Sequence, residues 1–211
     1  MFKRNKVITE GFISTIEEGL TFMLPKERNL DTYEKEVRQI LKEHTLDHPI
    51  IEFGAAIGVV SCLAKVDIAV EANPYLIPYL VENRNTNKCK FKIINKALSY
   101  TTNGSVTLHI DRSFVASSLK RESSKTIIER VSVSTVNIQE LATVPSTIIL
   151  SVEGAEIDAI RHDDFSNVKT LLVGFRPRIT GRWNIHRAMF SLWLKGFRIV
   201  RRINDTILYT R

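Results

Sequence analysis

Short apolar segments alternate with helical segments along the first half of the chain, and this alternation constrains the fold most strongly. Ile50-Ile51-Glu52-Phe53 ends at a Gly-rich turn, after which residues 57–65 form a predicted helix. A second strand is expected at 66–70, a helix at 76–85 and a third strand at 92–95. This order is typical of βαβ units on a parallel sheet and predicts a doubly wound α/β fold.

The second half continues this pattern and closes with a hairpin. The strands expected there are 105–110, 131–136, 147–152 and 169–175. One helix is expected near 155–162, and another begins near 185 and stops at Gly196. The last two strand-like runs, 197–203 and 206–209, are joined by Asn204-Asp205. Rossmann-like methyltransferases carry such a terminal antiparallel hairpin, whereas dehydrogenase-type nucleotide folds usually end in parallel strands. We therefore expect a Rossmann-like class I methyltransferase fold: a mostly parallel central sheet, helices on both faces and a C-terminal antiparallel hairpin.

Length and composition predict one folded domain. The 211 residues are 44% hydrophobic and 25% charged, which describes an ordinary core. Residues 1–48 are interpreted as an N-terminal extension with a helix near 31–44, and residues 49–211 as the Rossmann-like core. Residues 176–183 are expected to form a polar loop.

Several features of the sequence limit where the protein can be located and which ligands it can bind. The longest uncharged apolar run, 53–64, is shorter than the roughly 20 residues that cross a bilayer, so no membrane partner is expected. The first residues lack the apolar region of a signal peptide, which predicts a cytoplasmic protein. Cys62 and Cys89 do not have the spacing of a zinc site, and no metal is expected.

Positive charge is concentrated near the C-terminus. Residues 161–211 hold 11 Lys and Arg against 3 Asp and Glu, a net charge of +8, whereas residues 1–160 hold 19 against 20. A basic segment on a neutral body attracts anions such as a phosphate, an acidic sugar or nucleic acid. The same charge also fits a surface that keeps the protein soluble.

The first strand and its turn suggest a cofactor site. Gly54, Ala55 and Gly58 would let a ligand approach the backbone at the carboxyl end of the strand. Their GxxxG spacing differs from the GxGxxG of dinucleotide folds. Glu52 would repel a pyrophosphate but suits the ammonium group of S-adenosylmethionine. Glu71 ends the second strand, where a carboxylate can accept both ribose hydroxyls, so a nucleoside cofactor is favoured over a plain helix–strand contact.

Three short blocks lie in order along roughly residues 50–160. They are GAAIG at 54–58, VEANP at 70–74 followed by Asn83 and Asn87, and VEGAE at 152–156. Together they resemble the FkbM-type family of S-adenosylmethionine-dependent methyltransferases. The corresponding blocks of that family are GANIG, VEPNP with its spaced asparagines, and DVEGAE.

The resemblance implies a cofactor, a reaction and a set of residues. The cofactor is S-adenosylmethionine, and the reaction is usually O-methylation of a sugar or another small hydroxylated acceptor. The residues that would face the methionine part are Glu52, Gly54, Ala56 and Gly58. Glu71 and Asn73 would face the ribose and adenine, and Ser99 and Ser118 would line the same cleft.

The chain departs from the family at several acidic positions. Ile149 and Ser151 stand where the family has lysine and aspartate, and neither 137–139 nor 173–175 carries the usual acid. Glu153 is the remaining acid at the end of the strand expected at 147–152. We expect it to act as a base or to orient the acceptor. The alternative is a structural role at the start of the helix that follows.

Arginines after the strand expected at 169–175 are the candidates for acceptor binding. Arg176, Arg178 and Arg182 are expected on the cofactor side of the sheet, where their forked side chains suit a phosphate or carboxylate. His186 follows on the next helix and is a candidate proton acceptor, although a lone histidine is more often a plain surface residue.

Three readings of the function stay open on these grounds. The first is O-methylation of an anionic small molecule or glycan, such as a sugar phosphate. The second is a catalytically weakened methyltransferase fold that binds nucleic acid or a partner through its basic tail. The third is methylation of RNA, for which the charge is present without an aromatic platform motif.

Overall fold

The computed structural model describes residues 12–17, 19–25, 32–101, 104–111, 117–119 and 127–211. Its main sheet has seven strands in the order β11-β12-β10-β9-β3-β4-β5. These strands are β3 (Ile50–Phe53), β4 (Ile68–Val70), β5 (Lys92–Ile94), β9 (Ser146–Leu150), β10 (Val168–Gly174), β11 (Arg198–Ile203) and β12 (Thr206–Thr210). The five strands from β10 to β5 are parallel, and β12 pairs antiparallel with both β10 and β11. The predicted terminal hairpin is confirmed.

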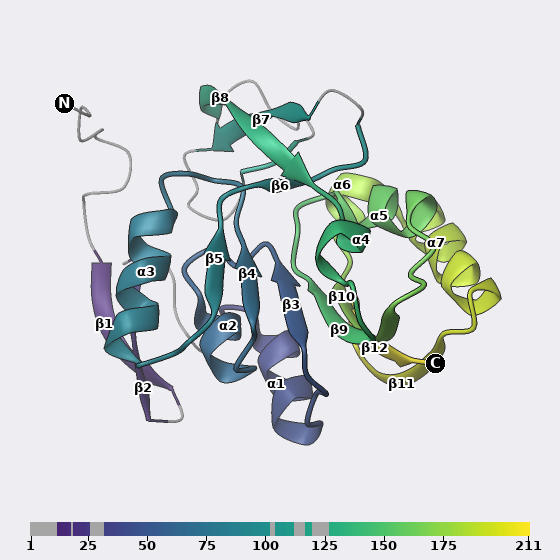
Figure 1. Ribbon diagram of the computed structural model, residues 1–211, viewed down its shortest axis with the longest axis horizontal. Coiled ribbons are helices and arrows are strands. Elements are labelled where there is room, and N and C mark those ends of the chain that lie inside the picture. Colours follow the sequence, from purple (N-terminus) through teal and green to yellow (C-terminus); the bar gives the residue numbers. More distant parts are fainter. Residues whose placement is uncertain (1–11, 18, 26–31, 102–103, 112–116, 120–126) are drawn as a thin grey trace.

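Helices cover both faces of this sheet (Figure 1). They are α1 (Lys35–Glu43), α2 (Val59–Leu63), α3 (Ile77–Thr86), α5 (Glu156–His162) and α7 (Arg182–Leu194). Successive residues of a strand point to opposite faces, so Ile148 and Leu150 pack with α5 and α7 while Ile149 packs with α1 and α2. All five residues of β9 are buried, as expected for a central strand covered on both sides. The expected α/β fold with helices on both faces is confirmed.

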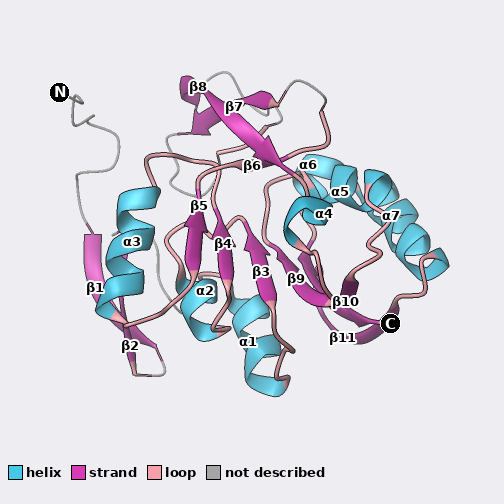
Figure 2. Cartoon of the chain, viewed as in Figure 1, coloured by secondary structure: helices cyan, strands magenta, loops and turns pink. Residues whose placement is uncertain are grey.

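A small second sheet lies beyond the carboxyl ends of β3, β4 and β5 (Figures 1 and 2). It has the order β6-β8-β7, with β6 at Ala97–Leu98, β7 at Ser105–Asp111 and β8 at Ile127–Val136. Four of its buried residues, Ala97, Leu108, Ile110 and Val133, form a separate cluster, whereas Leu98 and Val136 pack in the core beneath the main sheet. The sequence predicted two of these strands but not β6, because two residues are too few to show an alternating pattern.

The N-terminal segment is more than an extension. It forms a hairpin of β1 (Phe12–Glu17) and β2 (Leu20–Pro25), and β2 lies beside α3 (Figure 1). Asn83 and Asn87 hold it there through their side-chain amides: Asn83 Oδ1 accepts from the amide of Met23 at 2.8 Å, and Asn87 Oδ1 from that of Thr21 at 2.7 Å. The spaced asparagines of the second sequence block therefore have a structural role.

Several predicted boundaries need correction. The first helix begins at Lys35 and not at 31, because Glu34 has φ 48° and cannot be part of a right-handed helix. Residue 31, where that helix was expected to begin, lies outside the described residues. Two short helices were not predicted: α4 (Ile138–Leu141), and α6 (Pro177–Thr180) within the expected polar loop. In the described part of the chain, the helices are too short or too polar to span a bilayer.

Candidate functional site

A cleft opens where the carboxyl ends of β3, β4 and β9 meet the small sheet. Five predicted site residues contribute to its wall: Gly54, Ala56, Glu71, Ser118 and Glu153. This is the edge where an open α/β sheet binds its ligands. The topology therefore brings the first, second and third sequence blocks together around one cavity.

Gly54 allows two neighbouring strands to approach closely. It has φ 87°, and its amide donates to the carbonyl of Val70 on β4 at 2.9 Å. A Cβ at this position would lie 2.3 Å from the carbonyl oxygen of Ser151, which follows β9. Only glycine fits both the backbone angle and this contact.

Glu71 presents a fixed carboxylate at the end of β4. Its Oε2 accepts the amide of Ala56 at 2.7 Å, and its Oε1 accepts the amide of Asn73 at 2.7 Å. Burial raises the pKa of Glu71, and these backbone amides act in the opposite direction. Each carboxylate oxygen has a second lone pair, so the amides orient the group and leave it able to accept further hydrogen bonds.

The backbone of Ala56, whose amide donates to Glu71, has an unfavourable conformation. Its φ is 48°, in the left-handed region that residues with a Cβ rarely adopt. The FkbM-type pattern has asparagine here, which tolerates this conformation better than alanine does.

Replacing Ala56 by glycine is expected to stabilise the protein by about 0.5–1 kcal/mol, because glycine has no Cβ to clash in this conformation. The comparison is Ala55→Gly, since Ala55 does not have a positive φ and its replacement should be destabilising. Urea unfolding of both variants measures the difference. A loss of stability in Ala56→Gly equal to that in Ala55→Gly would contradict the backbone argument.

Other predicted cofactor residues lie around or behind the cleft. Asn73 is buried, and its side-chain amide donates to Ser117 Oγ on the wall at 3.2 Å. Ala55 and Gly58 do not line the cleft, and Gly58, at φ 86°, is the N-cap of α2. Ser99 does not border this cleft and lines a separate hollow beside Tyr100.

Glu52 lies behind the wall. It is 1% exposed, and it accepts a short hydrogen bond from the hydroxyl of Ser61 on α2. Burial raises the pKa of Glu52 to about 8. At neutral pH this residue is mainly protonated and faces the helix layer, so it does not present a carboxylate to the cleft.

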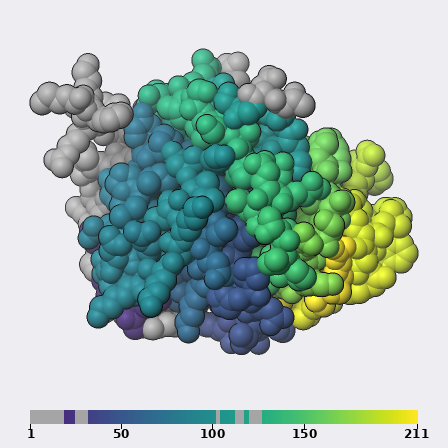
Figure 3. Space-filling view, viewed as in Figure 1, coloured from purple at the N-terminus to yellow at the C-terminus, as the bar shows by residue number. Residues whose placement is uncertain are grey.

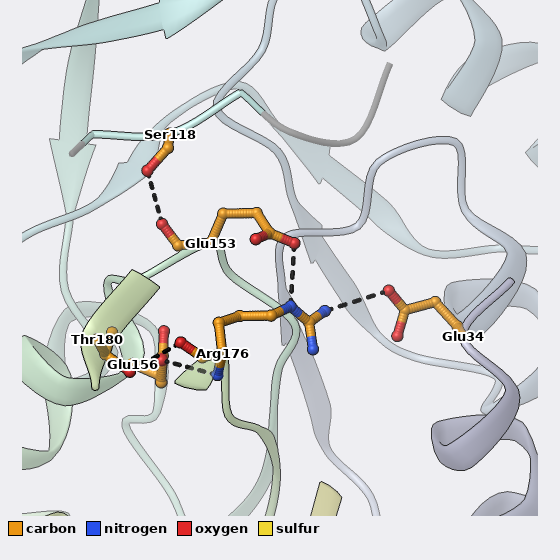
Figure 4. Close-up of polar contacts among 6 residues, drawn as sticks. All are labelled: Glu34, Ser118, Glu153, Glu156, Arg176 and Thr180. Carbon is orange, nitrogen blue, oxygen red and sulfur yellow. Dashed lines mark hydrogen bonds and ion pairs between the residues drawn. The ribbon is translucent and has the colours of Figure 1, made fainter. Parts of the chain in front are cut away.

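An arginine joins two acids at the open end of the cleft (Figure 4). Arg176 Nε donates to Glu153 Oε1 at 3.0 Å, and its Nη2 lies 3.5 Å from Glu34 Oε1. The three side chains are between 21% and 26% exposed. Burial raises the pKa of Glu34, and the charge of Arg176 opposes this. Arg176 therefore ties the start of α1 to the third sequence block.

Glu153 stands between the cleft and a basic recess. It lines both cavities, and its backbone carbonyl accepts the hydroxyl of Ser118 at 2.8 Å. The recess is also lined by Arg176, Arg178 and Arg182, as their positions after β10 predicted. His186 is exposed on α7 and does not line either cavity.

Two buried oxygens near the cleft lack a hydrogen-bond partner among the described residues. One is Ser151 Oγ, on the cleft wall, and the other is Oε2 of Glu156, behind it. Burial raises the pKa of Glu156 to about 7. An unpaired buried hydroxyl on a cavity wall is a group that a polar ligand could satisfy.

Sequence reasoning missed part of this wall. Tyr33 and Glu34 come from a segment interpreted as an extension, and no local pattern places them here. Ser151 was noted only as a departure from the family's aspartate. In the part of the chain that the structure describes, no three His, Cys, Asp or Glu side chains are grouped to hold a metal.

Solved structures share this architecture. P. horikoshii TYW2 in complex with MeSAdo aligns with a TM-score of 0.51 at 13% identity, over 95% of this chain and 70% of that one. Methanocaldococcus jannaschii Trm5 in complex with adenosine aligns with a TM-score of 0.50 at 14% identity, over 94% of this chain. The chain has the class I methyltransferase fold. It spans about half, 53%, of the length of Trm5.

Sequence comparisons give no closer relation. No family model matches the chain, and no curated protein matches its sequence. The FkbM-type resemblance therefore rests on the three short blocks, and the class I methyltransferase fold rests on the structure.

Proposed function

We propose that this protein is an S-adenosylmethionine-dependent methyltransferase with an anionic acceptor. The observation that carries the proposal is the carboxylate of Glu71, which two backbone amides hold at the carboxyl end of β4 and on the wall of the cleft. A carboxylate at this point of an α/β sheet accepts ribose hydroxyls. Two solved structures with this fold carry MeSAdo or adenosine, which supports a nucleoside cofactor.

The cleft fits such a cofactor chemically. Glu71 would hold the ribose, the turn at Gly54 and Ala56 would pass close to the methionine part, and Ser151 Oγ offers an unpaired polar group. When bound, S-adenosylmethionine supplies a methyl group on sulfonium sulfur, which a nucleophile can displace in line. We also propose, more specifically, that the protein is an FkbM-type enzyme and that it methylates an oxygen atom of its acceptor.

The chain's own contribution to the transfer is positioning. Glu153 lies where the cleft meets the recess, so an acceptor held by Arg178 and Arg182 would place its nucleophile beside this carboxylate. There Glu153 can orient a hydroxyl or receive the proton that the acceptor loses. The Glu153–Arg176 contact limits how far the carboxylate can move.

Phosphate is the acceptor group that the recess favours. Arginine side chains bind phosphate in a forked geometry, and both RNA and a phosphorylated sugar supply it. We place RNA ahead of a sugar, because the basic charge continues beyond the recess through most of residues 161–211. Binding to RNA should then weaken steeply with salt, whereas the affinity for the cofactor should not.

Calorimetric titration with S-adenosylmethionine and its demethylated product tests the cofactor site. Glu71→Ala should weaken binding about a hundredfold, because the carboxylate that would accept hydrogen bonds from both ribose hydroxyls is lost. Glu71→Gln keeps an acceptor and should lose less. Exposed Glu82 on α3 provides the control Glu82→Ala, which should bind as wild type does. Absence of binding to folded wild-type protein would overturn the proposed function.

Arg178→Ala tests the acceptor side. Its exposed guanidinium lines the recess and is not part of the Glu34–Arg176–Glu153 contact. The variant should therefore raise the acceptor KM about tenfold and leave cofactor affinity unchanged. Initial rates with RNA and with sugar phosphates, at low and moderate salt, measure this. An unchanged KM for every accepted substrate would remove Arg178 from the acceptor site.

A further inference from the structure

One side of α7 exposes large apolar residues where a surface helix usually carries polar ones. Trp183, Phe190, Trp193 and Leu194 are 73%, 60%, 53% and 65% exposed. The helix packs on the molecule through its other side, where the buried residues are Ile185, Ala188 and Leu192. A helix that is apolar on both sides is normally covered on both sides. We call the exposed side, with these four residues, the α7 face.

The exposed apolar surface continues onto the edge of the main sheet. Ile199 and Val200 of the outermost strand, β11, are 51% and 45% exposed. Arg198 connects the two elements: its Nη1 donates to the carbonyl of Trp193 at 3.1 Å, and its guanidinium lies 5.4 Å from the centre of the Trp193 ring. Of the eight large hydrophobic residues that are exposed in the described chain, six lie within residues 183–200. Figure 3 shows this end of the chain, in yellow, on the outer side of the molecule.

Along α7 and β11 themselves, the charged side chains have one sign. Residues 182–203 contain six Lys and Arg and no Asp or Glu. Arg187 lies within the exposed side of the helix, and Arg198 lies over one of its rings. A second copy of the chain would set arginine against arginine across a two-fold interface, which is unfavourable. The occupant of this face must therefore combine apolar and anionic groups.

Single-stranded RNA meets this requirement less well than a lipid surface. Nucleobases stack on free aromatic rings, but Phe190 and Trp193 already stack on each other, with centroids 5.8 Å apart and an interplanar angle of 19°. Aliphatic Leu194 and Ile199 add nothing to base stacking. Trp, Phe and Leu beside arginines are the composition of helices that lie in the boundary between lipid headgroups and acyl chains.

We propose that the α7 face docks on the surface of an anionic lipid bilayer. Trp183, Phe190 and Leu194 would enter the headgroup boundary, and Arg187 and Arg198 would meet lipid phosphates. This docking needs no membrane-spanning segment, which is why the short apolar runs of the sequence do not exclude it. It is independent of the proposed methyl transfer, because none of these residues lines the cofactor cleft.

The tryptophans provide a direct measurement. The chain has two, and both lie on the α7 face. Adding vesicles of phosphatidylcholine with about one-third phosphatidylglycerol should shift their emission to the blue, and pure phosphatidylcholine should do so much less. Phe190→Ala/Leu194→Ala keeps both tryptophans and should bind at least tenfold more weakly. Arg187→Gln should weaken binding severalfold on anionic vesicles only.

Matched controls carry the same changes elsewhere. Ile128→Ala/Val144→Ala removes exposed apolar side chains outside the α7 face, and Lys92→Gln removes a charge at the opposite edge of the sheet. Both should bind vesicles as wild type does. Vesicle flotation gives the partition coefficients, and sedimentation the oligomeric state.

Four results would each overturn docking on lipid. The first is that wild type does not float with anionic vesicles, and the second is that wild type and Phe190→Ala/Leu194→Ala float equally. The third is that wild type is a dimer and the double variant a monomer. The fourth is that wild type binds RNA but not vesicles, and the double variant no longer binds RNA. Titration of the same samples with S-adenosylmethionine measures cofactor binding, which tests the proposed function. The two proposals can therefore fail independently.

Discussion

Gly54→Ala is expected to destabilise the protein by about 3 kcal/mol or more and to abolish cofactor binding. A left-handed conformation alone costs an alanine roughly 1–2 kcal/mol. In addition, the new Cβ would lie 2.3 Å from the backbone oxygen of Ser151, and a backbone atom cannot rotate away as a side chain can. The turn after β3 must then move relative to the turn after β9, and both form the cleft.

Gly196→Ala separates the two causes. Gly196 has φ 92°, close to the φ of Gly54, but nothing lies within 4 Å of an added Cβ. Gly196→Ala should lower the free energy of unfolding only by the cost of the left-handed backbone conformation, roughly 1–2 kcal/mol. It should leave cofactor affinity unchanged. Urea unfolding and calorimetric titration measure both effects. If the two variants lost equal stability, close packing of Gly54 against Ser151 would not be the reason for this glycine.

Glu52→Gln is expected to stabilise the protein by about 3 kcal/mol at pH 7 and to flatten its dependence on pH. Burial raises the pKa of Glu52 from 4.5 to about 8. Between these values the unfolded chain has lost the proton that the folded protein keeps. The unfolded state then binds fewer protons, so the free energy of unfolding falls as the pH rises through this window.

The glutamine variant should remove that part of the slope. Its side-chain oxygen can still accept from Ser61, but it carries no proton to lose. Wild type and variant should therefore be closest in stability below pH 4.5 and differ most above pH 8. Glu82→Gln, on the surface of α3, should leave the profile unchanged. Equal slopes for wild type and Glu52→Gln in urea unfolding between pH 5 and 8 would show that Glu52 does not remain protonated.

Much of the sheet could be predicted from local patterns. Buried parallel strands such as β3 and β9 are continuous apolar runs, and a glycine turn after β3 marks where the chain reverses. The terminal hairpin was visible in two apolar runs around Asn204-Asp205. By contrast, β6 and α6 have two and four residues, too few for a periodic pattern, and long-range contacts decide them.

The candidate site divides in the same way. Gly54 and Glu71 follow strands in sequence, so the rule that ligands bind at the carboxyl ends of strands places them correctly on one wall. Glu34 and Tyr33 also line that wall, because the residues just before α1 lie beside the cleft. No pattern of residues along the chain predicts this position. Arg176 was predicted at the acceptor site, but its partners Glu34 and Glu153 could not be predicted.

The sequence by itself determined the order of the strands of the main sheet and of the helices that cover it, the turn at Gly54, and the acid at the end of β4, because these depend on neighbouring residues and on hydrophobic periodicity. Only the tertiary structure decided that Glu52 faces Ser61 behind the wall, and that α7 has an apolar side without cover. The direction in which a side chain points from a fully buried strand, and what covers the outer side of a helix, depend on elements far away in the sequence.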